Sequence, residues 1–222
     1  MTATVGGAVA TRVRLRRSRF GRATLEAAFV PDEPLDPLEG GAVALDLGGA
    51  RVFTGASYRG GLDGGVARVR AREAPGLERR LPPRFYDLTD ARLVARDALR
   101  EAGEAGEVAL SAALPAFVRV AGTAAALLSR LCERERAVWR TRPDGTVYAG
   151  PEPDAPEVAL AWGDEAIGRR PEDGAFELLL RPALLPGARV RVDAPGGVAA
   201  GRVDALEHTL ERGEARTWIW IA

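Results

Sequence analysis

The stretch TRVRLRR, residues 11–17, alternates apolar and charged side chains without interruption. Val13 and Leu15 fall on one face and Arg12, Arg14 and Arg16 on the other, which is the two-residue period of a half-buried β-strand. Successive arginines on one face project about 6.8 Å apart, since a strand rises about 3.4 Å per residue. The stretch therefore predicts a strand with one face in a core and one basic face.

Further strands are expected nearby, over residues 25–30, 42–47, 51–54 and 66–72. The run 25–30 is followed by the strand breakers Pro31, Pro34 and Pro37, and Gly48-Gly49 between two other runs predicts a hairpin turn. Several short strands joined by glycine-rich turns favour a β-barrel or a β-sandwich.

The middle of the chain changes to a helical period. Apolar residues from Leu88 to Ala102 predict a helix, with Asp87 or Thr89 as N-cap and Gly103 after its end. A second helix is expected over 124–136, with Thr123 as N-cap. The turn Pro143-Asp144-Gly145 should join strands at 137–142 and 146–150, because each residue type suits its place in a turn.

Strands return in the last third of the chain, over residues 158–162, 176–181, 188–193, 198–210 and 215–221. The order predicts an α+β, mainly β fold, in which a small α/β unit of two helices and a hairpin is inserted into a β-barrel. The expected boundaries are 1–75 for the first part of the barrel, 76–156 for the inserted unit and 157–222 for the rest. That last part either closes the barrel or forms a second barrel-like domain.

Composition narrows the function classes. The 222 residues carry 31 basic and 31 acidic side chains, every basic one an arginine, so no net charge directs the chain to nucleic acid or membrane. One cysteine and one histidine exclude an internal disulfide, a thiolate zinc cluster and a histidine-rich metal site. No apolar run approaches the roughly 18 residues of a membrane helix, and no signal peptide pattern opens the chain.

Chemistry-bearing motifs are absent from the sequence. Cys132 lies on the apolar side of the second expected helix, which favours a buried core residue over a reactive thiol, and His208 is expected at the surface or an interface. No spacing singles out a catalytic pair of carboxylates, and the glycine pairs match no phosphate-binding motif. We therefore expect no catalytic residue, no cofactor and no metal site, and no enzyme activity.

Two features point to contacts with other molecules. Residues 12–22 hold six arginines and no acid, so Arg12, Arg14 and Arg16 form either a solvated face or a contact with a neighbouring subunit's carboxylates or a passing polyanion. Near the end, Trp218 and Trp220 belong to a strand that is bulky and apolar on both faces. That strand is either buried within the chain or turns its tryptophans toward another subunit.

Several passages resemble the bacteriophage tail hub (baseplate hub) proteins, in order along about two-thirds of the chain. The helix from Gly122 to Leu131, followed by Trp139-Arg140 and by Pro143 to Gly150, is similar to a helix-then-WRxxPDGT passage of that family. The other similar passages are Tyr86 to Gly103, Arg181 to Gly187, and the closing hairpin Val203 to Leu210 with Arg216 to Ile221.

This resemblance implies a tail-tube-like barrel and a structural role in the phage tail tip. It implies a homo-oligomeric ring, a trimer in most hubs, that joins the tail tube to the tip or spike around a channel through which DNA passes. The implied partners are the distal tail, tape measure and tip or spike proteins, in a virion assembled in the bacterial cytoplasm. A distal-tail adaptor ring is the alternative, and a cell-wall hydrolase with an acidic pair is a more distant one.

Overall fold

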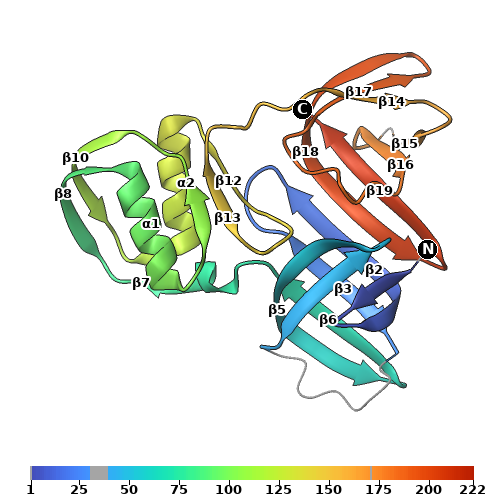
Figure 1. Cartoon of the computed structure of the whole chain (residues 1–222), viewed down its shortest axis with the longest axis horizontal. Coiled ribbons are helices and arrows are strands. Elements are labelled where there is room, and N and C mark those ends of the chain that lie inside the picture. The colour runs from blue at the N-terminus through green and yellow to red at the C-terminus, as the bar shows by residue number, and fades with distance from the viewer. Residues whose placement is uncertain (1, 31–39, 171) are drawn as a thin grey trace. The chain divides into compact units, whose positions relative to one another are not determined.

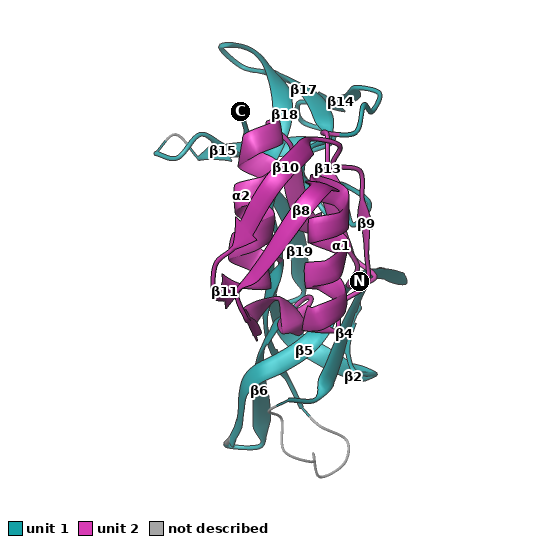
Figure 2. Cartoon of the chain, turned by 90° about the vertical axis from the view of Figure 1, so that its left-hand side faces the viewer, with its two compact units in different colours: residues 1–19, 23–72, 153–222 teal, residues 20–22, 73–152 magenta. Residues whose placement is uncertain are grey.

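The structure is a computed structural model that describes residues 2–30, 40–170 and 172–222. The chain forms two compact units (Figures 1 and 2). The first unit is drawn from residues 1–19, 23–72 and 153–222, and the second from residues 20–22 and 73–152. The second unit is therefore inserted in the sequence of the first.

Six strands of the first unit close into an antiparallel barrel. They are hydrogen-bonded in the order β1–β4–β5–β6–β3–β2, and β2 pairs back with β1 to close the ring. Their bounds are β1 Ala3–Val5, β2 Ala8–Ser18, β3 Thr24–Phe29, β4 Ala42–Leu47, β5 Ala50–Asp63 and β6 Val66–Arg72. Closure leaves β1 to β6 with partners on both sides over much of their length, which removes exposed sheet edges.

Alternation in the sequence explains why these strands face a common core. Val13 and Leu15 of β2 are buried while the arginines between them are exposed, and Ala67 and Val69 of β6 are buried in the same way. Gly48 and Gly49 both take positive φ in the turn between β4 and β5, which hairpin turns require. The strand-breaking prolines 31, 34 and 37 lie outside the described residues.

The C-terminal strands continue the barrel sheet around a second apolar core. Strand β18 lies between β2 and β19 over residues 205–211, and its earlier part pairs with β17. The bounds are β14 Val158–Ala161, β15 Ala166–Arg170, β16 Ala175–Leu179, β17 Arg189–Ala194, β18 Gly197–Glu211 and β19 Glu214–Ile221. Phe176, Leu206 and Ile219 are central members of this second core.

The second unit places two helices side by side between two small sheets (Figures 1 and 2). Strand β8 pairs with β10 on one side of the helices, while β12, β13 and β9 form a three-stranded sheet on the other. The bounds are η1 Pro75–Glu78, β7 Arg80–Leu81, β8 Arg84–Asp90, α1 Ala91–Ala102, β9 Gly106–Val108, β10 Ala113–Arg119, β11 Gly122–Thr123, α2 Ala124–Glu135, β12 Val138–Thr141 and β13 Val147–Gly150. A mainly β fold with an inserted α/β unit, expected from the sequence, is confirmed.

The ends of the helices follow local side-chain chemistry. Thr123 is the N-cap of α2 as expected, since its hydroxyl accepts a hydrogen bond from the Ala126 N–H. The expected caps Asp87 and Thr89 are wrong for α1, because β8 continues through both residues. Asp90 is the N-cap there, and its carboxylate accepts from the Leu93 N–H.

Candidate subunit-contact surfaces

The arginine face of β2 is exposed, and part of its charge is met within the chain. Arg14 lies 2.9 Å from Glu207 and Arg12 lies 3.8 Å from Glu211, both acids coming from the neighbouring strand β18. The Arg14 side chain is still 57% exposed. The ion pairs therefore hold the arginines in place and leave their guanidinium groups accessible to another molecule.

The two tryptophans of β19 lie half-buried on the outward face of the strand, while Thr217 and Ile219, which alternate with them, point into the core. The guanidinium carbon of Arg170 lies 4.2 Å from the centre of the Trp218 ring, and that of Arg16 lies 5.8 Å from the centre of the Trp220 ring. These distances suit cation–π contacts. The fold thus brings Arg16 and Trp220, separated by the length of the chain, to one surface.

Strand β19 offers no free edge to another subunit over residues 216–219. There its backbone pairs with β18 on one side and β16 on the other. Any contact that Trp218 makes with a second molecule must therefore be made through its side chain. Whether Arg12, Arg14, Arg16, Trp218 and Trp220 touch a neighbouring subunit stays a prediction.

A groove of about 810 Å³ lies on the same arginine face, over strands β2, β3, β5 and β6. We call it the arginine groove, and its charged lining residues are Arg12, Arg14, Arg59, Arg68, Arg70 and Glu26. The floor is formed partly by small residues, since Ala28, Gly60 and Gly61 also line it. Five cations and one carboxylate make it a site that attracts anions.

His208 corrects the sequence-based expectation of a surface or interface residue. Its side chain is 1% exposed, and Nδ1 lies 3.0 Å from the Thr217 hydroxyl on the paired strand β19. Burial, with a smaller effect from the nearby Arg17, lowers the pKa of His208 to about 3. The expectation was wrong because the alternation of β18 places Leu206, His208 and Leu210 on its core face.

Cys132 is buried in the core of the second unit, as expected. Burial, and to a smaller degree the nearby Glu135, raises the pKa of its thiol to about 12. Because the thiolate is the reactive species, this cysteine has little nucleophilic character at neutral pH.

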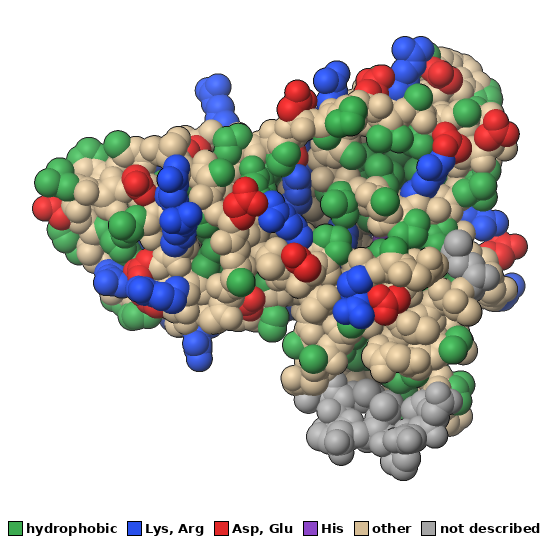
Figure 3. Space-filling view, viewed as in Figure 1, with side chains coloured by type: hydrophobic (Ala, Val, Ile, Leu, Met, Phe, Trp, Pro, Cys, Tyr) green, Lys and Arg blue, Asp and Glu red, His purple; other side chains and the backbone are tan. Residues whose placement is uncertain are grey.

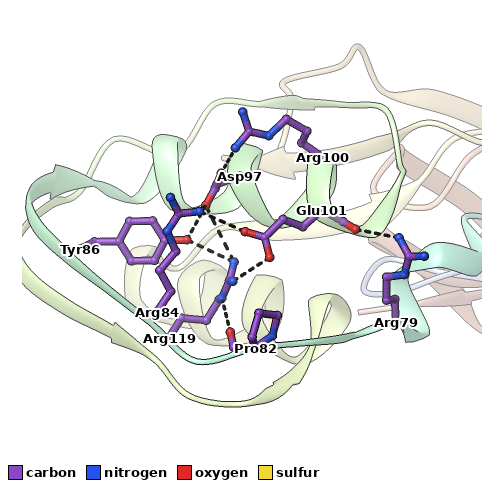
Figure 4. Close-up of polar contacts among 8 residues, drawn as sticks. All are labelled: Arg79, Pro82, Arg84, Tyr86, Asp97, Arg100, Glu101 and Arg119. Atoms are coloured by element: carbon purple, nitrogen blue, oxygen red, sulfur yellow. Dashed lines mark hydrogen bonds and ion pairs between the residues drawn. The ribbon is translucent and has the colours of Figure 1, made fainter.

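A polar cluster that the sequence did not predict fixes the two-stranded β8–β10 sheet to α1 (Figure 4). At its centre Asp97 of α1 accepts a 2.7 Å hydrogen bond from the Tyr86 hydroxyl and pairs with Arg84 at 2.5 Å. Arg119 of β10, 2% exposed, donates to the Glu101 carboxylate at 2.8 Å and to the Pro82 carbonyl at 3.0 Å. We call this group the Asp97 cluster, and its members are Tyr86, Arg84, Asp97, Glu101 and Arg119.

The pKa values in the Asp97 cluster follow from burial, hydrogen bonds and neighbouring charges. Burial alone would raise the pKa of Asp97, but the Tyr86 hydrogen bond and the guanidinium groups of Arg84, Arg100 and Arg119 outweigh it and lower that pKa. Burial, together with the hydrogen bond to Asp97, raises the pKa of Tyr86 to about 12. Asp97 is therefore ionised and Tyr86 protonated at neutral pH. The signal in the sequence was an acid among Val94, Ala95 and Ala98, on the apolar face of the expected helix.

The opposite face of the β8–β10 sheet exposes apolar side chains. Phe85 and Val118 stand opposite each other in the strand register and are both exposed, and Leu88, which has a positive φ, is 85% exposed. Exposed apolar side chains gathered on one sheet face are a feature of surfaces that contact other proteins.

The described residues hold no group of three or more His, Cys, Asp or Glu side chains placed to bind a metal ion. Neither helix of the described chain has the length and apolar character that crossing a bilayer demands.

On the face drawn in Figure 3, arginines and acids are interspersed, which is the arrangement of a surface that can form many ion pairs.

Comparison with known proteins places the fold. No protein-family model and no curated protein sequence matches the chain. Among solved structures, the 43 kDa tail protein of prophage MuSo2 from Shewanella oneidensis aligns with a TM-score of 0.77 and 12% identity, covering 100% of this chain and 97% of that one. A tail protein from Neisseria meningitidis MC58 aligns with a TM-score of 0.76 and 16% identity, covering 98% and 95%.

A third structure comes from Escherichia coli. It is described as a component of the type VI secretion system with structural similarity to the T4 bacteriophage tail proteins gp27 and gp5. It aligns with a TM-score of 0.73 and 13% identity, covering 100% of this chain and 76% of that one. The chain therefore has the fold of phage tail proteins, which confirms the fold expected from the resemblance to tail hubs.

Proposed function

We propose that the protein is a structural subunit of a phage tail tip, a hub ring that joins the tail tube to the tip or spike around an axial channel. The observation that carries this proposal is the likeness in fold, over nearly the whole chain, to two tail proteins. A closed barrel with an exposed charged face supports it, because ring subunits need capped sheet edges and side-chain surfaces that fit a copy of themselves.

The proposed partners are further copies of the chain, as a trimer, and the distal tail, tape measure and tip or spike proteins. The proposed location is the virion, after synthesis in the host cytoplasm, with DNA in contact only as it passes through the channel. In this role the protein carries out no reaction, and its contribution is its shape.

The mass of the protein in solution tests the proposal. Light scattering during size-exclusion chromatography of the purified protein, alone and with its tail partners, should give about three times 23.5 kDa for a trimer. A distal-tail adaptor ring would instead give about six times that mass. A species that stays a 23.5 kDa monomer at high concentration, with and without the partners, would contradict both.

A second candidate rests on the third aligned structure. Because a component of a type VI secretion system shares the fold, the chain also fits the equivalent hub of a contractile injection machine. Purified particles distinguish the two candidates, since a phage hub is recovered with DNA-containing virions and an injection-machine hub with DNA-free ones.

A further inference from the structure

Charge is unevenly divided along a chain whose net charge is zero. Residues 1–72 contain eleven arginines and seven acids, whereas residues 153–222 contain eight arginines and twelve acids. The N-terminal barrel is therefore net positive, and the C-terminal strands that continue its sheet are net negative by the same amount. Two copies that meet barrel to C-terminal strands would have complementary charge.

We propose that the arginine groove of one copy receives the acidic border of a second copy, where the acidic border is Asp164, Glu172 and Asp173 at the two ends of strand β15. The inference deepens the proposed ring and rests on it. It assigns a partner to the groove and a direction to the contact.

The geometry of the groove suits carboxylates. Two rows of arginines, Arg12 and Arg14 on β2 and Arg68 and Arg70 on β6, flank the intervening strand β3 at a separation of about 10 Å, two strand spacings. Within a row the side chains repeat about every 6.8 Å. Guanidinium groups bind carboxylates through two parallel hydrogen bonds, so fixed rows of arginines recognise fixed acids.

The groove already binds one carboxylate of its own chain. Glu26 on the floor strand β3 lies 3.0 Å from Arg70. That contact is an intramolecular example of the pairing that we propose between copies.

The acidic border lies where the sheet of the first unit ends. Strand β15 is the last in the strand order. Among the described strands, it pairs with β16 alone. Asp164 is exposed just before β15, and Glu172 after it is 71% exposed and 3.7 Å from Arg170. A border strand with exposed acids at both ends is accessible to a second molecule.

The lining of the groove favours a protein partner over nucleic acid. Proteins that hold single strands combine cations with aromatic side chains on which the bases stack. No Phe, Tyr or Trp is among the described residues that line the groove, and a carboxylate sits on its floor. Because groove and border are different surfaces of one chain, the contact is head-to-tail, the kind that closes rings.

Charge reversal tests the inference in the full-length protein. Arg59→Glu with Arg68→Glu cancels the net positive charge of the groove, leaving three arginines and three glutamates in its lining, and Asp164→Arg with Glu172→Arg makes the border basic. All four side chains are exposed, so circular dichroism should show an unchanged fold. Sedimentation equilibrium then measures the association constant of each variant. A matched control, Arg96→Glu with Arg134→Glu, makes the same charge change on exposed helix positions of the second unit.

We expect each double variant to associate at least tenfold more weakly than the unchanged protein and the control. The chain with all four reversals should recover most of the loss, because the carboxylates introduced in its groove face the guanidinium groups introduced in its border. If the unchanged protein assembles and neither double variant weakens it, the groove contact is wrong and the ring stands. If the unchanged protein assembles neither alone nor with its tail partners, the ring itself is wrong.

A nucleic acid partner gives a different result. In that case the groove reversal would abolish binding of a single-stranded oligodeoxythymidine and leave self-association unchanged, which would overturn the inference. The same oligonucleotide binding equally to the groove variant and the unchanged protein, together with loss of association in the variant, would support it.

Discussion

His208 shows how burial determines the charge of a single side chain in this protein. The imidazole lies in the core between β2 and β19, where Nδ1 lies 3.0 Å from the Thr217 hydroxyl and where Arg17 is near. Neither neighbour offsets the cost of moving a charged ring out of water, so the neutral form is favoured. The histidine is therefore part of the packing of the first unit.

The pH dependence of unfolding tests this state of His208. Its pKa is about 3 in the fold and about 6.5 when unfolded, so between these values the unfolded chain binds a proton that the folded chain does not. The free energy of unfolding should fall with decreasing pH below about 6.5, by up to about 1.4 kcal/mol per pH unit from this group.

Urea unfolding at pH 7.5, 6 and 5 measures that slope. His208→Gln should reduce it, while Leu206→Ala, a control that weakens the same core and keeps the histidine, should not. Equal slopes in all three proteins would show that His208 takes up its proton over the same pH range in the folded and the unfolded chain, which would contradict its burial as a neutral ring.

Cys132 allows a second test at the same scale. Because the thiol is buried and its pKa is raised to about 12, we expect iodoacetamide to leave it unmodified at pH 7.5 in the native protein and to modify it completely in urea. Mass spectrometry of the intact chain gives the modified fraction. Rapid native labelling would contradict its place in the core.

At the scale of elements, the Asp97 cluster helps to attach the β8–β10 sheet to α1. The sheet pairs with no further strand among the described residues, so its position depends on the burial of Leu114 in the core and on Tyr86 and Arg119 meeting Asp97 and Glu101 of α1. Removing one partner of a buried charged set leaves the others unpaired, which costs more than the pair itself contributed.

Two substitutions around one carboxylate measure that attachment. Asp97→Asn should lower the free energy of unfolding by about 2 kcal/mol at pH 7, because Arg119 is buried. Arg100→Gln removes another ion pair of Asp97, but Arg100 is 76% exposed, so the loss should stay below about 0.5 kcal/mol.

Hydrogen exchange of residues 84–90 and 113–119 should quicken in Asp97→Asn only. Since the fold lowers the pKa of Asp97, its contribution is present above about pH 4 and is lost as the pH falls through the lower, folded value. The difference in free energy of unfolding between the unchanged protein and Asp97→Asn should therefore become smaller in acid. If Asp97→Asn and Arg100→Gln lowered the free energy of unfolding equally at pH 7, the Asp97 cluster would not hold the β8–β10 sheet as described.

Elements with a regular period were predictable from the sequence, and elements held by distant partners were not. Strands β4 and β6 and helix α1 follow from their alternation or their helical period. Strands β8 and β10 were missed because Leu88 interrupts the alternation at a positive φ and Pro115 falls within the second strand. Their pairing joins residues more than twenty positions apart, which no local pattern encodes.

The candidate surface was predictable to the same limited extent. The exposed arginines of β2 followed from the alternation of residues 11–17. The groove beside them did not, because its other wall comes from Arg59 and Arg68 on β5 and β6, whose distance from β2 depends on the pairing of β3 with both β2 and β6. In the same way, only the pairing of β2 with β18 brings Arg16 near Trp220.

At the scale of the whole molecule, the chain combines a closed barrel, balanced total charge and an uneven distribution of that charge. A protein whose barrel is closed can still assemble, provided that its side chains form complementary surfaces. The charge of the arginine groove and of the acidic border supplies such surfaces. Association that depends on them should weaken as salt rises from 0.05 to 0.5 M, because ions screen exposed charges over about 10 Å at 0.1 M.

Electron microscopy of the purified protein tests the ring most directly. Class averages of particles at low salt, with the tail partners added if the protein alone does not assemble, show whether copies of the chain surround a channel. We predict an annular particle with three-fold symmetry and a central opening. Small particles the size of a single chain, with no opening under any of these conditions, would contradict the account.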